Sequence, residues 1–152
     1  MSAPIEVLFY QLERAPLDKV LPGLLERTLA RGWRAVVQAG SQERVEALDG
    51  LLWTYTDESF LPHGTARDGF AERQPVFLTT GEDNPNGATV LFLVDGAEAP
   101  DLSGYLRAVY LFDGRDPDAL AQARREWKRL KGDGHAATYW QQSEQGRWEK
   151  KA

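Results

Sequence analysis

The chain has no cysteine and only two histidines, His63 and His135, among its 152 residues. Disulfides, thiol nucleophiles and thiolate metal sites are therefore excluded, and two distant histidines do not have the spacing of metal ligands. No apolar run approaches the length of a membrane span, and Met1–Leu8 lacks the basic start and apolar centre of a signal peptide. We therefore expect a cytoplasmic protein without a metal or a membrane partner.

The sequence also lacks the glycine-rich loops that bind phosphate groups. Neither G-x-G-x-x-G nor G-x-x-x-x-G-K-[ST] occurs, and the turn after the first expected strand, residues 11–16, has no glycine. The glycines of residues 81–87 precede a strand, whereas a phosphate site needs free amides at a helix start. We expect no nucleotide and no other cofactor.

What the chain does contain is an alternation of apolar strands and amphipathic helices. Helical spacing and caps predict helices over Leu17–Arg31, from Ser41 to about Trp53, and over Asp116–Lys131, with Asp18, Ser41 and Asp116 as candidate N-caps. Apolar runs predict strands over Ile5–Tyr10, Trp33–Ala39, Val76–Thr79, Ala88–Val94, Leu106–Phe112 and Ala136–Gln142.

This order predicts an α/β fold with a mostly parallel central sheet flanked by helices. We expect a single domain over residues 1–152, in which about 144–152 form a polar, partly frayed end. The long connection over 54–75 is expected to be functional or mobile, because structureless connections of that length are uncommon in compact domains.

Charge is distributed unevenly along the chain. Residues 1–118 carry 10 Lys and Arg against 19 Asp and Glu, whereas residues 119–152 carry 8 against 4. An acidic body with a basic end indicates a local anion-binding surface, not a broad nucleic-acid-binding surface.

The last predicted helix concentrates this positive charge beside an apolar seam. At about 100° per residue, the seam consists of Leu120, Ala123, Trp127 and Leu130. Arg124, Lys128 and Lys131 form a stripe next to it, whereas Arg125 and Arg129 are expected to point toward solvent. Basic residues in the last turn of a helix interact favourably with the helix dipole, which explains Lys131. This effect does not explain Arg124, because Arg124 lies in the middle of the helix. The functional alternative is a site for a peptide with carboxylates and an apolar end.

A second unusual stretch is Leu48–His63, which ends a helix and continues into an apolar connection. The connection contains Trp53, Tyr55, Phe60 and Leu61, although connecting segments are usually polar. Two destinations remain open for these side chains: the protein's own core or the groove of a partner. His63, a lone histidine after a proline, is expected to be a hydrogen-bonded structural residue.

Together these residues resemble a known family. The residues that carry the resemblance are Leu48, Asp49, Leu52, Trp53, Glu58, Ser59, Phe60, Pro62 and His63, followed by Ala123, Arg124, Trp127, Lys128 and Lys131. In order and spacing they resemble the chi subunit of the bacterial DNA polymerase III holoenzyme, over nearly the whole chain.

The resemblance implies a Rossmann-like fold and a non-catalytic accessory subunit that links the clamp loader to single-stranded DNA-binding protein. Arg124, Trp127, Lys128 and Lys131 would bind that protein's acidic C-terminal tail, which ends in proline-phenylalanine, so that DNA is contacted only indirectly. Trp53 and Phe60 would meet the psi subunit of the clamp loader or a helicase. Leu120 stands where the family can have a further lysine.

Two rival functions remain from the residues alone. The first is a small α/β hydrolase or a nucleotide-binding enzyme, because Asp95 and Asp113 follow predicted strands, where such enzymes place their carboxylates. However, each of these residues is followed by a glycine, and the dipeptide Asp-Gly is common in turns. The other rival is an interaction module for an unrelated acidic partner.

Overall fold

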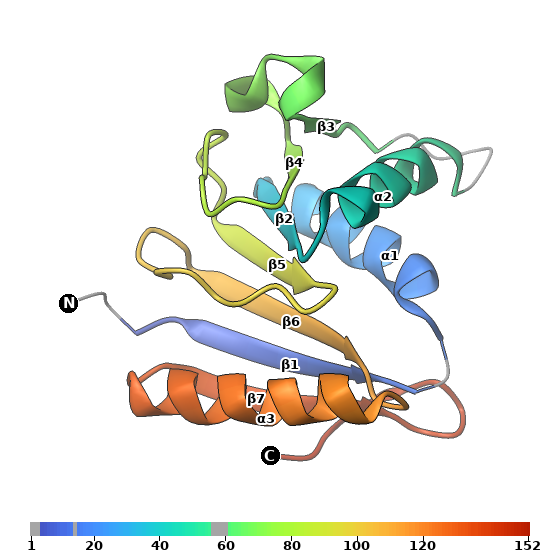
Figure 1. Ribbon diagram of the computed structural model, residues 1–152, viewed down its shortest axis with the longest axis vertical. Helices are drawn as coiled ribbons and strands as arrows, with labels where there is room; N and C mark the ends of the chain where they lie inside the picture. The colour runs from blue at the N-terminus through green and yellow to red at the C-terminus, as the bar shows by residue number, and fades with distance from the viewer. Residues whose placement is uncertain (1–3, 14, 56–60) are drawn as a thin grey trace.

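The computed structural model describes residues 4–13, 15–55 and 61–152, and Figure 1 shows the path of the chain. The strands are β1 (Glu6–Leu12), β2 (Ala35–Ala39), β3 (Gly64–Thr65), β4 (Val76–Thr79), β5 (Val90–Val94), β6 (Arg107–Asp113), β7 (Ala136–Gln142) and β8 (Trp148–Lys150). The helices are α1 (Leu17–Ala30), α2 (Gln42–Thr54) and α3 (Pro117–Gly132), with two short 3₁₀ helices at Ala66–Asp68 and Ala71–Arg73.

The eight strands form one sheet in the order β3-β4-β2-β5-β6-β1-β7-β8. Every neighbouring pair is parallel except β7 with β8. The predicted α/β fold with a mostly parallel sheet is therefore confirmed.

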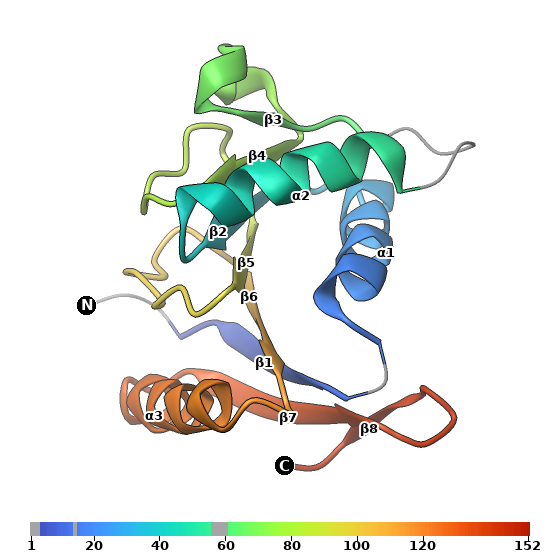
Figure 2. The ribbon, with the colours of Figure 1, turned by 45° about the vertical axis from the view of Figure 1, so that its right-hand side comes forward.

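The helices divide between the two faces of the sheet, and Figure 2 shows α1 to the right of the strands and α3 to the left. Successive side chains of each strand point to opposite faces of the sheet. Val7 and Phe9 of β1 pack in the core beneath α3, whereas Leu12 packs in the core beneath α1 and α2. Among the described α-helices, α3 alone thus packs on the face to which Val7 and Phe9 point.

Two of the three predicted helix caps are confirmed. The Ser41 side chain accepts a hydrogen bond from the Arg44 amide at 3.2 Å, and the Asp116 side chain accepts one from the Asp118 amide at 3.0 Å. Asp18 is not a cap, because α1 begins at Leu17 after Pro16.

The C-terminal end differs from the expectation of a frayed tail. β8 pairs antiparallel with β7, and the Lys151 amide donates to the Tyr139 carbonyl at 2.7 Å. The Trp148 ring packs 4.7 Å from the Tyr10 ring, measured between centroids. The open edge of β7 and this aromatic contact stabilise a segment whose own sequence is polar. None of the helices in the described ranges is long and apolar enough to cross a membrane.

Candidate functional site

The candidate site lies on α3, whose apolar side packs against the sheet as predicted. Ala123 and Leu130 are buried in the core, and Leu120 and Trp127 are partly buried at its margin. Packing against the sheet therefore determines which side of α3 faces inward. Helical geometry then places the stripe of cations directly beside that side.

Trp127 is held by aromatic neighbours from two strands. Its ring meets Phe9 of β1 and Tyr139 of β7 edge to face, with centroid distances of 5.3 and 5.8 Å. The Lys131 ammonium lies 4.9 Å from the centroid of the Trp127 ring. Trp127 therefore forms a rigid aromatic wall with a cation beside it, a suitable surface for an apolar end that carries a carboxylate.

Arg124 and Lys128 extend this surface along the helix, and both are exposed. Within the described part of the chain, Arg124, Lys128 and Lys131 have no carboxylate oxygen within 4.0 Å. We refer to Arg124, Trp127, Lys128 and Lys131 as the α3 surface. Ion pairs with the described residues therefore do not neutralise its three charges.

The structure adds Tyr139 to this region, a residue that the sequence reasoning did not assign. The Tyr139 hydroxyl donates a hydrogen bond to the Gln11 side-chain carbonyl. Burial raises the pKa of Tyr139, and the Arg124 guanidinium opposes that rise, so the positive charge lies close to the phenol. The signal in the sequence was the two-residue alternation of β7, which turns Ala137 and Tyr139 to the α3 side.

The other flank of α3 corrects one expectation. Arg129 does not simply point toward solvent: its guanidinium donates to the Ala99 carbonyl at 3.0 Å and pairs with Glu126 at 2.5 Å. Glu126 is only 5% exposed. The two flanks thus differ, because Arg129 forms an internal ion pair and Arg124 forms none with the described residues.

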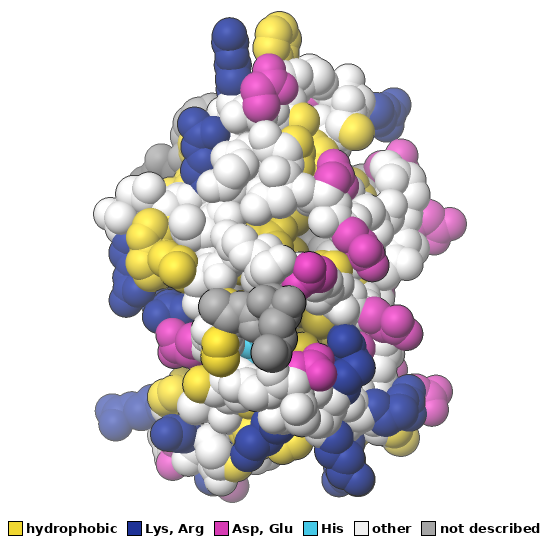
Figure 3. Space-filling view, turned by 90° about the vertical axis from the view of Figure 1, so that its left-hand side faces the viewer, with side chains coloured by type: hydrophobic (Ala, Val, Ile, Leu, Met, Phe, Trp, Pro, Cys, Tyr) yellow, Lys and Arg dark blue, Asp and Glu magenta, His cyan; other side chains and the backbone are white. Residues whose placement is uncertain are grey.

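The C-terminal tail pairs laterally with the edge of β7 and so extends the sheet, and the three cations of the α3 surface are exposed. Figure 3 shows Lys and Arg side chains gathered at the lower end of the molecule, where Figure 1 places α3. The positive charge that the sequence concentrates toward the C-terminal end of the chain therefore lies on the surface of the molecule.

The second predicted surface begins at the end of α2. Trp53 is 56% exposed, although its ring packs 4.7 Å from the ring of the buried His63. His63 is a structural residue as predicted, with its ring nitrogens 2.7 Å from the Leu61 carbonyl and 3.2 Å from the Asp49 carbonyl. Leu61 is core, whereas Phe60 lies outside the described residues.

The strand-end carboxylates of the rival enzyme hypothesis line one cavity of about 280 Å³. Each has its own arginine: Asp95 lies 3.8 Å from Arg44, and Asp113 lies 3.4 Å from Arg115. Asp95 also accepts a hydrogen bond from Ser41 at 3.2 Å. In the described ranges no three His, Asp or Glu side chains are grouped to hold a metal ion.

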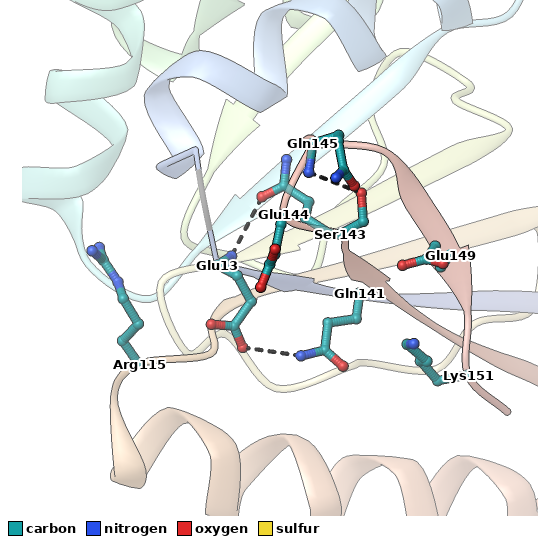
Figure 4. A pocket seen from close by; sticks show the side chains of 9 residues that line it. Glu13, Arg115, Gln141, Ser143, Glu144, Gln145, Glu149 and Lys151 are labelled. Carbon is teal, nitrogen blue, oxygen red and sulfur yellow. Dashed lines mark hydrogen bonds between the residues drawn. The ribbon is translucent and has the colours of Figure 1, made fainter.

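A larger cavity, of about 590 Å³, opens at the β7–β8 hairpin, and Figure 4 shows its lining. The lining is polar and of mixed charge, with Glu13, Glu144 and Glu149 set against Arg115 and Lys151. Hydrogen bonds within the lining include Gln141 to Glu13 at 3.4 Å. The acids oppose an anionic ligand, so this cavity does not compete with the α3 surface.

Comparison with known proteins gives two matches. The family model described as "DNA polymerase III chi subunit, HolC" matches residues 5–138. A protein of Rickettsia prowazekii (strain Madrid E), described as "Probable DNA polymerase III subunit chi", is 32% identical over 76 residues. That match covers 50% of this chain and 46% of the Rickettsia protein, so it spans about half of each.

Proposed function

Because this chain belongs to the DNA polymerase III chi subunit family, which consists of non-catalytic accessory subunits in DNA replication, we propose that it connects the polymerase to protein-coated single-stranded DNA. The α3 surface binds the acidic C-terminal tail of single-stranded DNA-binding protein, and a second surface binds the psi subunit of the clamp loader or a helicase. DNA itself is reached only through that coating protein.

The observation that carries this proposal is the set of unpaired cations around Trp127. Arg124, Lys128 and Lys131 lack internal carboxylate partners in the described part of the chain. A ligand's carboxylates can therefore bind without first breaking an ion pair, and arginine can bond both oxygens of one carboxylate. The net charge of −5 argues against direct binding to DNA phosphates.

The second surface includes Trp53 at the end of α2, with Phe60 following in the sequence. A large aromatic side chain that is 56% exposed is typical of a protein-protein contact. The partner there is the psi subunit of the clamp loader or a helicase.

The enzyme alternative has less support. Asp95 and Asp113 share a cavity, but each has an arginine partner and a role in an Asp-Gly turn. Family membership also favours an accessory subunit over a hydrolase.

A fluorescence titration with an acidic tail peptide ending in proline-phenylalanine tests the proposal. We expect a dissociation constant in the micromolar class that increases with salt, because the carboxylates bind exposed cations. A peptide without the terminal phenylalanine is the control for the aromatic wall. Equal affinity for the two peptides would reject the proposed site.

Co-purification identifies the occupant of the second surface. The chain is co-expressed with a psi subunit or with a helicase, as wild type and as Trp53→Ala or Phe60→Ala. We expect recovery of the true partner to fall in both variants, with Lys19→Ala on α1 as a control. Unchanged recoveries would show that the two aromatic side chains do not form this contact.

A further inference from the structure

A groove on the opposite face of the sheet carries an inference independent of the α3 surface. The groove has a volume of about 410 Å³ and lies between the C-terminal half of α1 and strands β5, β6 and β1. Figure 2 shows α1 beside the upper strands, with β1 and β7 continuing below it. None of the helices in the described ranges covers that lower part, where Tyr10 packs with Trp140 and Trp148.

The floor of this groove is apolar and the rim is basic. The floor is formed by side chains from three strands, namely Leu8, Val90, Phe92 and Val109. The rim carries Arg27 and Arg31 from α1 and Arg107 from β6, all in a chain of net charge −5. The helix dipole accounts for basic residues at the end of α1, but not for Arg107 or for a cavity with an apolar floor beneath them.

The arginines are arranged around one aromatic ring. The guanidinium carbons of Arg31 and Arg107 lie 4.9 and 5.5 Å from the centroid of the Trp33 ring. Arg107 also pairs with Glu6 at 3.1 Å, whereas Arg27 and Arg31 have no carboxylate within 4.0 Å among the described residues. Two cations therefore remain available above an apolar floor.

We propose that this groove, bounded by Arg27, Arg31, Arg107 and Trp33, binds a short internal segment of a partner protein in which carboxylates flank one apolar side chain. The apolar side chain contacts the floor between α1 and the strands, and the carboxylates pair with Arg27 and Arg31. The site is distinct from the α3 surface, because it lies on the other face and needs no chain terminus.

The geometry favours such a segment over single-stranded nucleic acid. Base stacking requires an open aromatic face. Trp33 already has two guanidinium groups against its ring, and Tyr10 packs against Trp148 with 4.7 Å between ring centroids. The remaining floor is mainly aliphatic, which accommodates a leucine or phenylalanine side chain better than it orients a base.

The test uses the full chain and four fluorescein-labelled peptides, acetyl-Asp-Glu-Asp-X-Asp-Glu-Asp-amide, with X as Leu, Ile, Phe or Trp. Blocked termini remove the terminal carboxylate that the α3 surface is proposed to bind. We expect at least one peptide to bind with a dissociation constant below about 1 mM, and its complex to shift the NMR signal of the Trp33 indole. Loss of a charged hydrogen bond in Arg31→Ala or Arg27→Ala should weaken binding by about tenfold or more.

Three controls make the result decisive. Lys19→Ala removes a charge from α1 outside the groove, and Arg125→Ala removes one from α3 outside both proposed sites, so both should bind like the wild type. A peptide with X as Ser should bind more weakly than the best apolar peptide. The proposal is overturned if no apolar peptide binds, if Arg31→Ala binds as tightly as Lys19→Ala, or if a twelve-nucleotide oligo(dT) binds more tightly than the peptides in an Arg31-dependent manner.

Discussion

The two faces of the sheet are packed with different kinds of side chain. Beneath α1 and α2 the core is mainly aliphatic and is closed by two helices, with Leu21, Leu25, Leu48 and Leu52 fully or almost fully buried. Beneath α3 the core is rich in aromatic rings, and α3 closes it together with the loop between β5 and β6. The first face mainly stabilises the fold, whereas the second also holds a rigid ring and three surface cations that have no carboxylate partner among the described residues.

The largest expected effect tests whether the α1/α2 face serves stability and not tail binding. Leu25 is 0% exposed, so Leu25→Ala should lower the free energy of unfolding by about 2–5 kcal/mol through lost burial and a cavity. Urea denaturation measures this loss. Affinity for the tail peptide, measured under conditions where the variant is folded, should not change. A parallel loss of affinity would contradict the division between the faces.

Alkaline pH should weaken the aromatic face. Burial raises the pKa of Tyr110 and Tyr105 to about 12, against about 10 in the unfolded chain. The unfolded state therefore loses these protons first, and the stabilisation present below pH 10 disappears as the pH rises toward 12. Each tyrosine should contribute a loss on the order of 2–3 kcal/mol.

Denaturation at pH 8 and pH 11.5 measures this loss, with Tyr110→Phe as the variant that cannot ionise there. The difference in unfolding free energy between the two pH values should be smaller in Tyr110→Phe than in the wild type. An identical difference would show that the phenol does not ionise more readily in the unfolded chain.

The third prediction compares two arginines on the same helix. Arg129→Ala removes the ion-pair partner of the buried Glu126 and should cost about 1–3 kcal/mol of stability. Arg124 has no carboxylate partner in the described part of the chain, so Arg124→Ala should change stability by less than about 0.5 kcal/mol. Chemical denaturation of both variants checks the difference. In Arg129→Ala, the further change Glu126→Gln should recover part of the loss.

The sequence predicted the features that depend on neighbouring residues. Local spacing and hydrogen-bonding capacity predicted the caps at Ser41 and Asp116, the strand Ala136–Gln142 and the apolar seam of α3. β8 was missed because its pairing depends on the open edge of β7 and on contact between Trp148 and Tyr10, which is distant in sequence.

The candidate site shows the same limit. Helical periodicity placed Arg124, Trp127, Lys128 and Lys131 together, but it could not place Tyr139 beside them, because that contact depends on β7 lying next to β1. The pairing of Arg129 with the Ala99 carbonyl depends on the loop after β5. Long-range pairing of strands and loops is not encoded in the periodicity of one helix.

The most direct test of the central claim compares tail-peptide affinity in Arg124→Ala and Arg125→Ala. The two variants remove the same side chain from adjacent positions, but only Arg124 belongs to the α3 surface. Arg124→Ala should lose about 1.5–3 kcal/mol of binding free energy, whereas Arg125→Ala should bind like the wild type. Equal affinities in the two variants would contradict the assignment of the α3 surface.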